Sequence, residues 1–154
     1  MIKKILVCIY IFVFIINCSS SNNKNIAKDN IRNPEEIFIS ANNYFANEEL
    51  VLAEEEFNYL IKLYPLSNEA INSEVILGFI SYLKLDYDMA SLQFDKIISK
   101  YPSHKDLDYV YYMKAICSYE QITHHELDGN FNDLALRNFE EVVNRFPNSK
   151  YAKD

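Results

Sequence analysis

The chain has 154 residues, of which 49% are hydrophobic and 14% aromatic, which is enough for the core of one ordinary domain and excludes a disordered chain. Two glycines and four prolines leave few turn-forming residues, which favours helices over a many-stranded sheet. From Pro34 onward, ten Lys and Arg face twenty-one Asp and Glu, and this net charge of −11 disfavours nucleic acids and anionic lipid surfaces as partners. We therefore expect an all-α domain that binds proteins.

The first seventeen residues resemble a secretory signal peptide, because two lysines precede an uncharged apolar run at 5–16. Twelve residues are fewer than the roughly 20 that a membrane-spanning helix needs, so export is favoured over a permanent transmembrane anchor. The run ends in Ile-Ile-Asn-Cys-Ser at 15–19, which resembles a lipobox, although Gly, Ala or Ser is usual at the position of Asn17. We expect residues 1–17 to be removed and Cys18 to carry the lipid.

Residues 18–33 are rich in Ser, Asn and Lys, so we expect a flexible tether between the lipid and the domain. Cys117 has no partner for a disulfide once Cys18 is acylated. Its neighbours in sequence are apolar and aromatic, and none is a base that would stabilise a thiolate. We therefore favour a small buried side chain at Cys117 over a reactive thiol.

A repeat organises the rest of the chain. Three residue types recur at fixed offsets, as Ala53, Phe57 and Pro65, then Ala90, Phe94 and Pro102, and finally Ala135, Phe139 and Pro147. The first two copies are 37 residues apart, and the same shift superposes the small residues Ala41, Gly78 and Ala115. The last copy lies 45 residues further on, so we expect an eight-residue insertion, placed as a lengthened loop at 124–133.

Each repeat divides into two amphipathic helices, since apolar residues recur at i, i+3, i+4 and i+7. The prolines end the second helices, and Ser67, Ser103 and Ser149 are candidate N-caps for the helices that come next in the chain. The expected helices lie near 34–47, 49–63, 68–84, 87–100, 106–122 and 132–146. The pattern resembles the tetratricopeptide consensus, which implies a right-handed α-solenoid with repeats at about 34–70, 71–107 and 108–147 and the start of a fourth.

One segment indicates a particular protein family more specifically than the repeat does. Residues 101–115 read YPSHKDLDYVYYMKA, which resembles the signature of the BamD (ComL-type) lipoproteins of the outer-membrane β-barrel assembly machinery. The resemblance extends to NPEEIF at 33–38, YPLSNEA at 64–70 and RFPNSKYAKD at 145–154. It implies a lipoprotein on the periplasmic face of the outer membrane that binds the insertase BamA and other assembly subunits. Such proteins usually have about two more repeats, in which BamA is held, so we expect a fragment or a shortened member.

The first helix of each hairpin lines the concave side of a tetratricopeptide solenoid, so the repeat predicts a protein-binding groove. Its expected residues are Phe38, Asn42, Phe45, Val75, Phe79, Tyr82, Tyr112, Ile116 and Tyr119. Aromatic walls suit an extended peptide, such as the aromatic-ended C-terminal segment of an unfolded outer-membrane protein. Packing between the hairpins would explain the same recurrence, and both interpretations stay open at this point.

The other polar clusters in the sequence are weaker indications of a functional site than the predicted groove. His124, His125, Glu126 and Asp128 are potential metal ligands, but adjacent histidines diverge, so we favour a solvated loop. For the acidic run at 48–49 and 54–56, a solvated helix face is favoured over a docking patch. The sequence contains no glycine-rich phosphate loop, zinc-spaced cysteine pair or nucleophile motif, so we expect neither an enzyme nor a cofactor. The alternative function is a lipoprotein adaptor for cell-envelope division or peptidoglycan synthesis.

Overall fold

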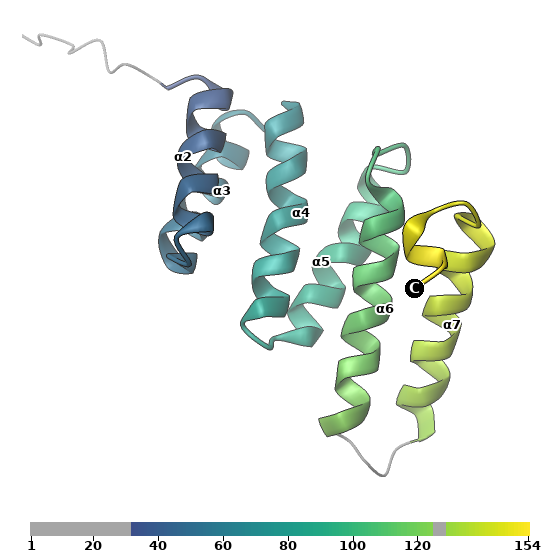
Figure 1. Cartoon of the computed structure of the whole chain (residues 1–154). Coiled ribbons are helices and arrows are strands. Elements are labelled where there is room, and N and C mark those ends of the chain that lie inside the picture. The colour runs from purple at the N-terminus through teal and green to yellow at the C-terminus, as the bar shows by residue number, and fades with distance from the viewer. Residues whose placement is uncertain (1–31, 125–128) are drawn as a thin grey trace, which may run out of the picture. The chain divides into compact units, whose positions relative to one another are not determined.

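The computed structural model describes residues 32–124 and 129–154, and this part of the chain is all-α. Its elements are α2 (Pro34–Ala46), α3 (Leu50–Leu63), α4 (Asn68–Leu83), α5 (Tyr87–Lys100), α6 (Leu107–His124), α7 (Gly129–Arg145) and the 3-10 helix η1 (Lys150–Ala152). Successive helices pair as three hairpins that stack along the chain (Figure 1). The predicted all-α fold of tetratricopeptide-like hairpins is confirmed. The predicted signal peptide, Cys18 and nearly all of the predicted tether lie outside the described residues.

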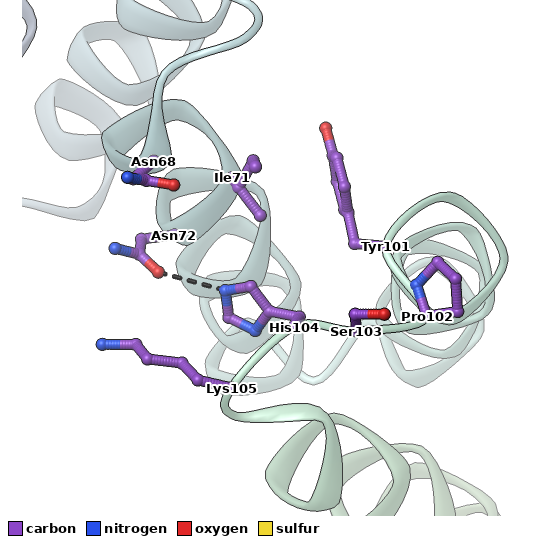
Figure 2. Close-up of a pocket in the computed structure, with 8 residues that line it drawn as sticks. All are labelled: Asn68, Ile71, Asn72, Tyr101, Pro102, Ser103, His104 and Lys105. Carbon is purple, nitrogen blue, oxygen red and sulfur yellow. Dashed lines mark hydrogen bonds between the residues drawn. The ribbon is translucent and has the colours of Figure 1, made fainter.

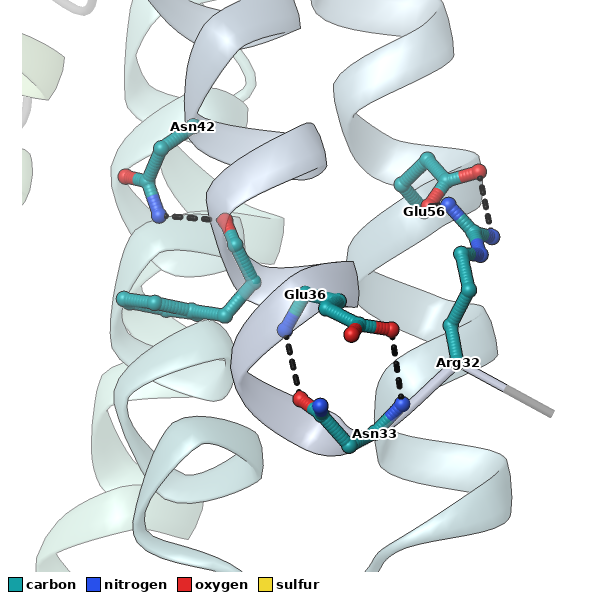
Figure 3. Close-up of polar contacts among 6 residues, drawn as sticks. Arg32, Asn33, Glu36, Asn42 and Glu56 are labelled. Carbon is teal, nitrogen blue, oxygen red and sulfur yellow. Dashed lines mark hydrogen bonds and ion pairs between the residues drawn. The ribbon is translucent and has the colours of Figure 1, made fainter. Parts of the chain in front are cut away.

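Helix beginnings are determined by local sequence. The Asn33 side chain accepts a hydrogen bond from the Glu36 N–H at 2.9 Å, and the Glu36 carboxylate accepts one from the Asn33 N–H at 3.2 Å (Figure 3). This reciprocal pair satisfies two backbone donors at the start of α2. Ser67 caps α4 as predicted, because its hydroxyl accepts from the Ala70 N–H at 3.0 Å. Ser149 caps η1 in the same way.

The third hairpin differs from the prediction in two places. Ser103 is not the cap of α6, which begins only at Leu107, because His104 forms the preceding turn with its carbonyl and its ring. The lengthened loop at 124–133 is shorter than predicted, since α6 runs to His124 and α7 begins at Gly129. Most of the insertion is therefore helical. Glycine is tolerated beside a helix N-terminus, where the backbone N–H groups have no helical partner in any case.

Small residues allow the two helices of each hairpin to approach, as the repeat predicted. Ala53 and Ala90 are fully buried and Ala135 is 3% exposed. Phe57 and Phe94 are fully buried against them and form the centres of the first two hairpins. Because a buried methyl-sized position leaves no space for a larger side chain, these sites hold the hairpin geometry.

Each hairpin stacks on the next mainly through its second helix, α3 on α4 and α5 on α6, and the first helices also meet one another. Among the described elements, α2 contacts α4 and α4 contacts α6, whereas α3 contacts α4 but not α5. The first helices therefore form one continuous face, which we call the first-helix face. None of the described helices combines the length and the apolar character that crossing a bilayer requires.

Cys117 is fully buried in the core between the second and third hairpins, with Phe94, Val110 and Met113 in the same cluster. Burial raises the pKa of its thiol to about 12. The predicted small buried side chain is confirmed, since a thiol with this pKa is protonated and unreactive at neutral pH. Val110 and Met113 of the signature segment are likewise core residues.

Candidate functional site

A cavity of about 600 Å³ crosses the first-helix face and is bordered by every one of its elements. Phe38 comes from α2, and the other lining residues come from α4, the loop before α6, the start of α6 and η1: Asn72, Val75, Ile76, Lys105, Asp106, Asp108, Tyr109, Lys150 and Tyr151. Its walls are aliphatic and aromatic, and its rim carries both lysines and carboxylates. Such a cavity suits a peptide that presents apolar side chains along an extended backbone.

A second cavity of about 540 Å³ adjoins the first, since Asn72 and Lys105 line both. Figure 2 shows it between the first turns of α4 and the loop before α6, with Tyr101 opposite Asn72 and His104. His104 Nδ1 accepts from the Asp106 N–H at 3.3 Å, so Nε2 is the donor toward Asn72 Oδ1 at 3.2 Å. The His104 ring thereby ties the loop to α4 and forms part of the wall of the second cavity.

Three tyrosines close the C-terminal side of the large cavity. Tyr151 of η1 stacks on Tyr112 at 5.0 Å between ring centroids and tilts against Tyr109 at 5.5 Å. Burial raises the pKa of Tyr109 to about 12. The Tyr112 hydroxyl donates to Asp154 Oδ2 at 2.5 Å, and this bond is the main reason that its pKa is also about 12. Both hydroxyls are therefore neutral at physiological pH.

The loop between α7 and η1 is attached to α6 by a polar contact. The Ser149 hydroxyl donates to Asp108 Oδ2 at 2.6 Å. Lys150 lies over the Tyr151 ring, with its Nζ 4.8 Å from the centroid. The Ser149 contact thus holds the residues after Pro147 against the start of α6.

Aromatic rings continue along the face toward the hairpin turns. Phe45 meets Phe79 edge to face at 6.1 Å, and Phe79 stacks on Tyr82 at 6.0 Å. Tyr82 in turn tilts against Tyr87 at 5.6 Å, and burial raises the pKa of Tyr82. All of these rings are half-buried. They form a connected row that joins the first and second hairpins, with each ring offering one edge or face to solvent.

The remaining predicted groove residues lie at varied depths. The Asn42 amide donates to the Phe38 carbonyl of its own helix at 2.7 Å, which leaves its oxygen available (Figure 3). Ile116 is half-buried. Tyr119 is 52% exposed and touches Phe139 edge to face at 6.5 Å. Val75 is only 8% exposed, so it serves mainly as packing at the cavity floor.

Six of the nine predicted residues therefore form two groups and not one uniform groove, and Asn42, Ile116 and Tyr119 belong to neither group. Phe38 and Val75 line the large cavity, and Tyr112 lies behind Tyr151. Phe45, Phe79 and Tyr82 form the aromatic row.

The prediction missed Asn72 and Tyr109, although a signal was present. Asn72 and Tyr109 are 37 residues apart in the sequence. Each lies three positions before a predicted groove residue, Val75 or Tyr112, so the repeat places both on the helix face that was predicted to line the groove.

The other polar clusters add little to this site. His125, Glu126 and Asp128 lie outside the described residues. Within the acidic run, Glu54 pairs with Lys84 at 3.0 Å and Glu56 with Arg32 at 3.0 Å, and the other three glutamates are exposed. No group of three potential metal ligands occurs in the described part of the chain.

Comparison with known proteins places this geometry in context. A family model described as an outer membrane lipoprotein, YfiO, matches residues 31–154. The outer membrane protein assembly factor BamD of Caulobacter vibrioides is 34% identical over 98 residues, which are 64% of this chain and 32% of that protein. BamD of Rickettsia prowazekii is 30% identical over 102 residues, or 66% and 41%, and BamD of Xylella fastidiosa is 28% identical over 153 residues, or 93% and 52%. The chain thus spans about a third to a half of the relatives' length.

Proposed function

The chain belongs to the YfiO family of outer-membrane lipoproteins, and from that membership we propose that it is a periplasmic scaffold of the β-barrel assembly machinery. The resemblance to BamD carried by residues 101–115 is confirmed by the family match and by relatives named as assembly factors. In this proposal the lipid on Cys18 holds the protein at the outer membrane. The folded part then binds BamA, other assembly subunits and unfolded barrel proteins on the periplasmic side.

The observation that carries the proposal is the cavity of about 600 Å³ that crosses all three first helices. A site that draws on three consecutive repeats can contact successive residues of one extended chain. Phe38, Val75 and Tyr109 supply apolar walls, and the neighbouring row from Phe45 to Tyr82 extends them. Partly exposed aromatic rings of this kind commonly dominate the energetics of peptide binding.

We propose that the ligand is the C-terminal segment of an unfolded outer-membrane protein, which ends in an aromatic residue. The aromatic end would enter the apolar part of the face. Lys105 and Lys150 line the large cavity and offer ammonium groups to a terminal carboxylate. Asp106 and Asp108 line the same cavity, and Asp108 is engaged by the Ser149 hydroxyl. These carboxylates would disfavour a second acidic group on the ligand.

The test is co-purification of the full-length tagged protein from detergent-solubilised membranes. We expect BamA to be recovered in stoichiometric amount, because a scaffold of the machinery is a stable subunit of it. An unrelated tagged outer-membrane lipoprotein is the control and should recover no BamA. Recovery of cell-wall enzymes without BamA would contradict the proposal and restore the adaptor for division or peptidoglycan synthesis, which the named relatives do not favour.

A further inference from the structure

A separate apolar surface lies at the turns of the first two hairpins, away from the first-helix face. It consists of Val51, Leu85, Met89 and Leu92, which are 64%, 68%, 44% and 63% exposed. We call these four residues the turn-end surface. Exposed apolar side chains mark an interaction site where they form one patch, whereas scattered single residues are ordinary on a protein surface.

One ion pair holds the turn of the second hairpin against the start of α3, beside these side chains. Val51 lies about one turn before Glu54 on α3. The Glu54 carboxylate accepts hydrogen bonds from Lys84 Nζ at 3.0 and 3.1 Å, and Lys84 is the residue before Leu85 in the chain. The Asp86 carboxylate caps α5 by accepting from the Met89 N–H at 3.1 Å, which holds the turn against that residue. Leu92 lies one turn further along the same face of α5.

The backbone conformation at Leu85 indicates that the requirements of folding do not explain a leucine at this position. Leu85 has φ +62°, and the N–H groups of Leu85 and Asp86 bond back to Tyr82 and Ser81 at 2.9 and 3.0 Å. This helix-ending arrangement normally has glycine at the left-handed position, because L side chains rarely adopt that conformation. A leucine placed there, with most of its side chain in solvent, contributes neither to the turn nor to the core.

The first hairpin provides an internal comparison. A shift of 37 residues superposes Leu85 on Glu48, which has the same φ of +62°, and Leu92 on Glu55. Both glutamates are exposed. The fold therefore accepts a carboxylate at both positions, and the apolar residues of the second hairpin are not required for packing.

The charge around the turn-end surface indicates the chemistry of its partner. Residues 47–55 and 84–92 contain six carboxylates and one lysine, and that lysine is paired with Glu54. The carboxylates are Glu48, Glu49, Glu54, Glu55, Asp86 and Asp88. We propose that the turn-end surface binds an amphipathic helix of a partner protein, one whose apolar face is flanked by Lys and Arg. An anionic bilayer would be repelled by the same carboxylates.

The experiment measures fluorescence anisotropy of a labelled 14-residue amphipathic helix of Leu and Lys against the full-length protein in phosphatidylcholine nanodiscs, with empty nanodiscs as the blank. The wild type should bind this peptide at least about tenfold more tightly than Leu85→Glu/Leu92→Glu, which copies the first hairpin. The variant adds two negative charges, so attraction by charge alone would tighten binding. Weaker binding by the double variant would therefore show the contribution of the apolar contact alone. A control helix of Leu and Glu should bind the wild type at least about tenfold more weakly than the Leu and Lys helix.

Two controls separate this surface from the first-helix face. Tyr119→Ala should leave binding of the Leu and Lys helix unchanged, and circular dichroism melts should show that every variant folds. Equal or tighter binding by the double variant would overturn the proposal, as would equal binding of the acidic helix or an equal loss in Tyr119→Ala. A wild-type dimer that the double variant dissociates, seen by sedimentation without peptide, would assign the surface to a second copy instead.

Discussion

Gly78 of α4 faces the ring of Phe94 of α5 so closely that a Cβ on the glycine would lie 2.7 Å from Phe94 Cε1. Equivalent positions in the first and third hairpins hold Ala41 and Ala115, and both are fully buried. The second hairpin therefore packs one methyl group tighter than its neighbours, and the phenylalanine at its centre fills the space that a Cβ would need. A contact of this length cannot persist without movement of the ring or of the helices.

Gly78→Ala should therefore destabilise the protein, even though alanine is the better helix former. Overpacking of a core typically lowers the free energy of unfolding by about 1–3 kcal/mol, and the roughly 1 kcal/mol gained in helix propensity leaves a net loss of up to about 2 kcal/mol. The measurement is urea unfolding followed by circular dichroism. Combining it with Phe94→Leu should give a double variant whose loss is smaller than the sum of the single losses. A stabilised Gly78→Ala protein would show that the two helices do not approach this closely.

Much of this core was predictable from the sequence. The spacing of Ala, Phe and Pro locates the helix pairs, because small and aromatic residues at fixed offsets leave few ways to pack a hairpin. The sequence does not predict the turn geometry at Glu48 and Leu85, since both positions lack the glycine that signals a left-handed cap. It also does not predict the contact of Tyr151 with Tyr112, because that contact joins residues whose pairing depends on where η1 folds back.

The sequence predicts only part of the candidate site, because spacing gives the helix face of a residue and not its depth. The repeat places residues on the first-helix face, as Phe38, Phe45 and Tyr82 show, but it carries no information on depth. Val75 is nearly buried and Tyr119 is half exposed, although both satisfy the same periodicity. Depth depends on the size of neighbouring side chains across helices, and this is set by tertiary packing and not by spacing.

Glycine at the strained turn positions should stabilise the protein. Leu85→Gly and Glu48→Gly each remove a side chain from a left-handed backbone conformation that costs about 1 kcal/mol for residues other than glycine. We expect each variant to raise the thermal midpoint by a few degrees in circular dichroism melts. Ala46→Gly, at an exposed site in ordinary helix, is the matched control and should lower it. A lower midpoint in Leu85→Gly would mean that the leucine contributes to folding.

Alkaline pH should weaken the fold through Tyr109. Its pKa of about 12 lies above the ordinary value of 10, so the folded state holds the proton more tightly than the unfolded state. The corresponding stability is present below pH 10 and is lost as the pH rises from about 10 to 12. In urea unfolding at pH 9 and pH 11.5, Tyr109→Phe should lose less stability than the wild type. An unchanged pH dependence in Tyr109→Phe would exclude Tyr109 as a cause.

Acylation at Cys18 is open to a direct test. The cysteine comes after an apolar run and the lipobox-like sequence, so a cell grown with an alkyne fatty acid should incorporate the label into the protein. Cys18→Ser should abolish labelling. Cys117→Ser should retain it, because Cys117 is buried in the core. Equal labelling of wild type and Cys18→Ser would show that the anchor is not at this residue.

The proposed binding of the aromatic-ended C-termini of unfolded barrel proteins to the first-helix face can be tested by one titration. A fluorescent peptide of that kind is titrated into full-length wild type, Phe45→Ala, Tyr82→Ala and Tyr119→Ala in phosphatidylcholine nanodiscs, with a peptide lacking the final aromatic residue as control. We predict that Tyr82→Ala weakens binding about thirtyfold, equivalent to about 2 kcal/mol, with little change in thermal midpoint, because its half-buried ring belongs to the aromatic row on the first-helix face. Unaltered affinity in all three variants, with folding intact, would exclude the first-helix face as the binding site for this peptide.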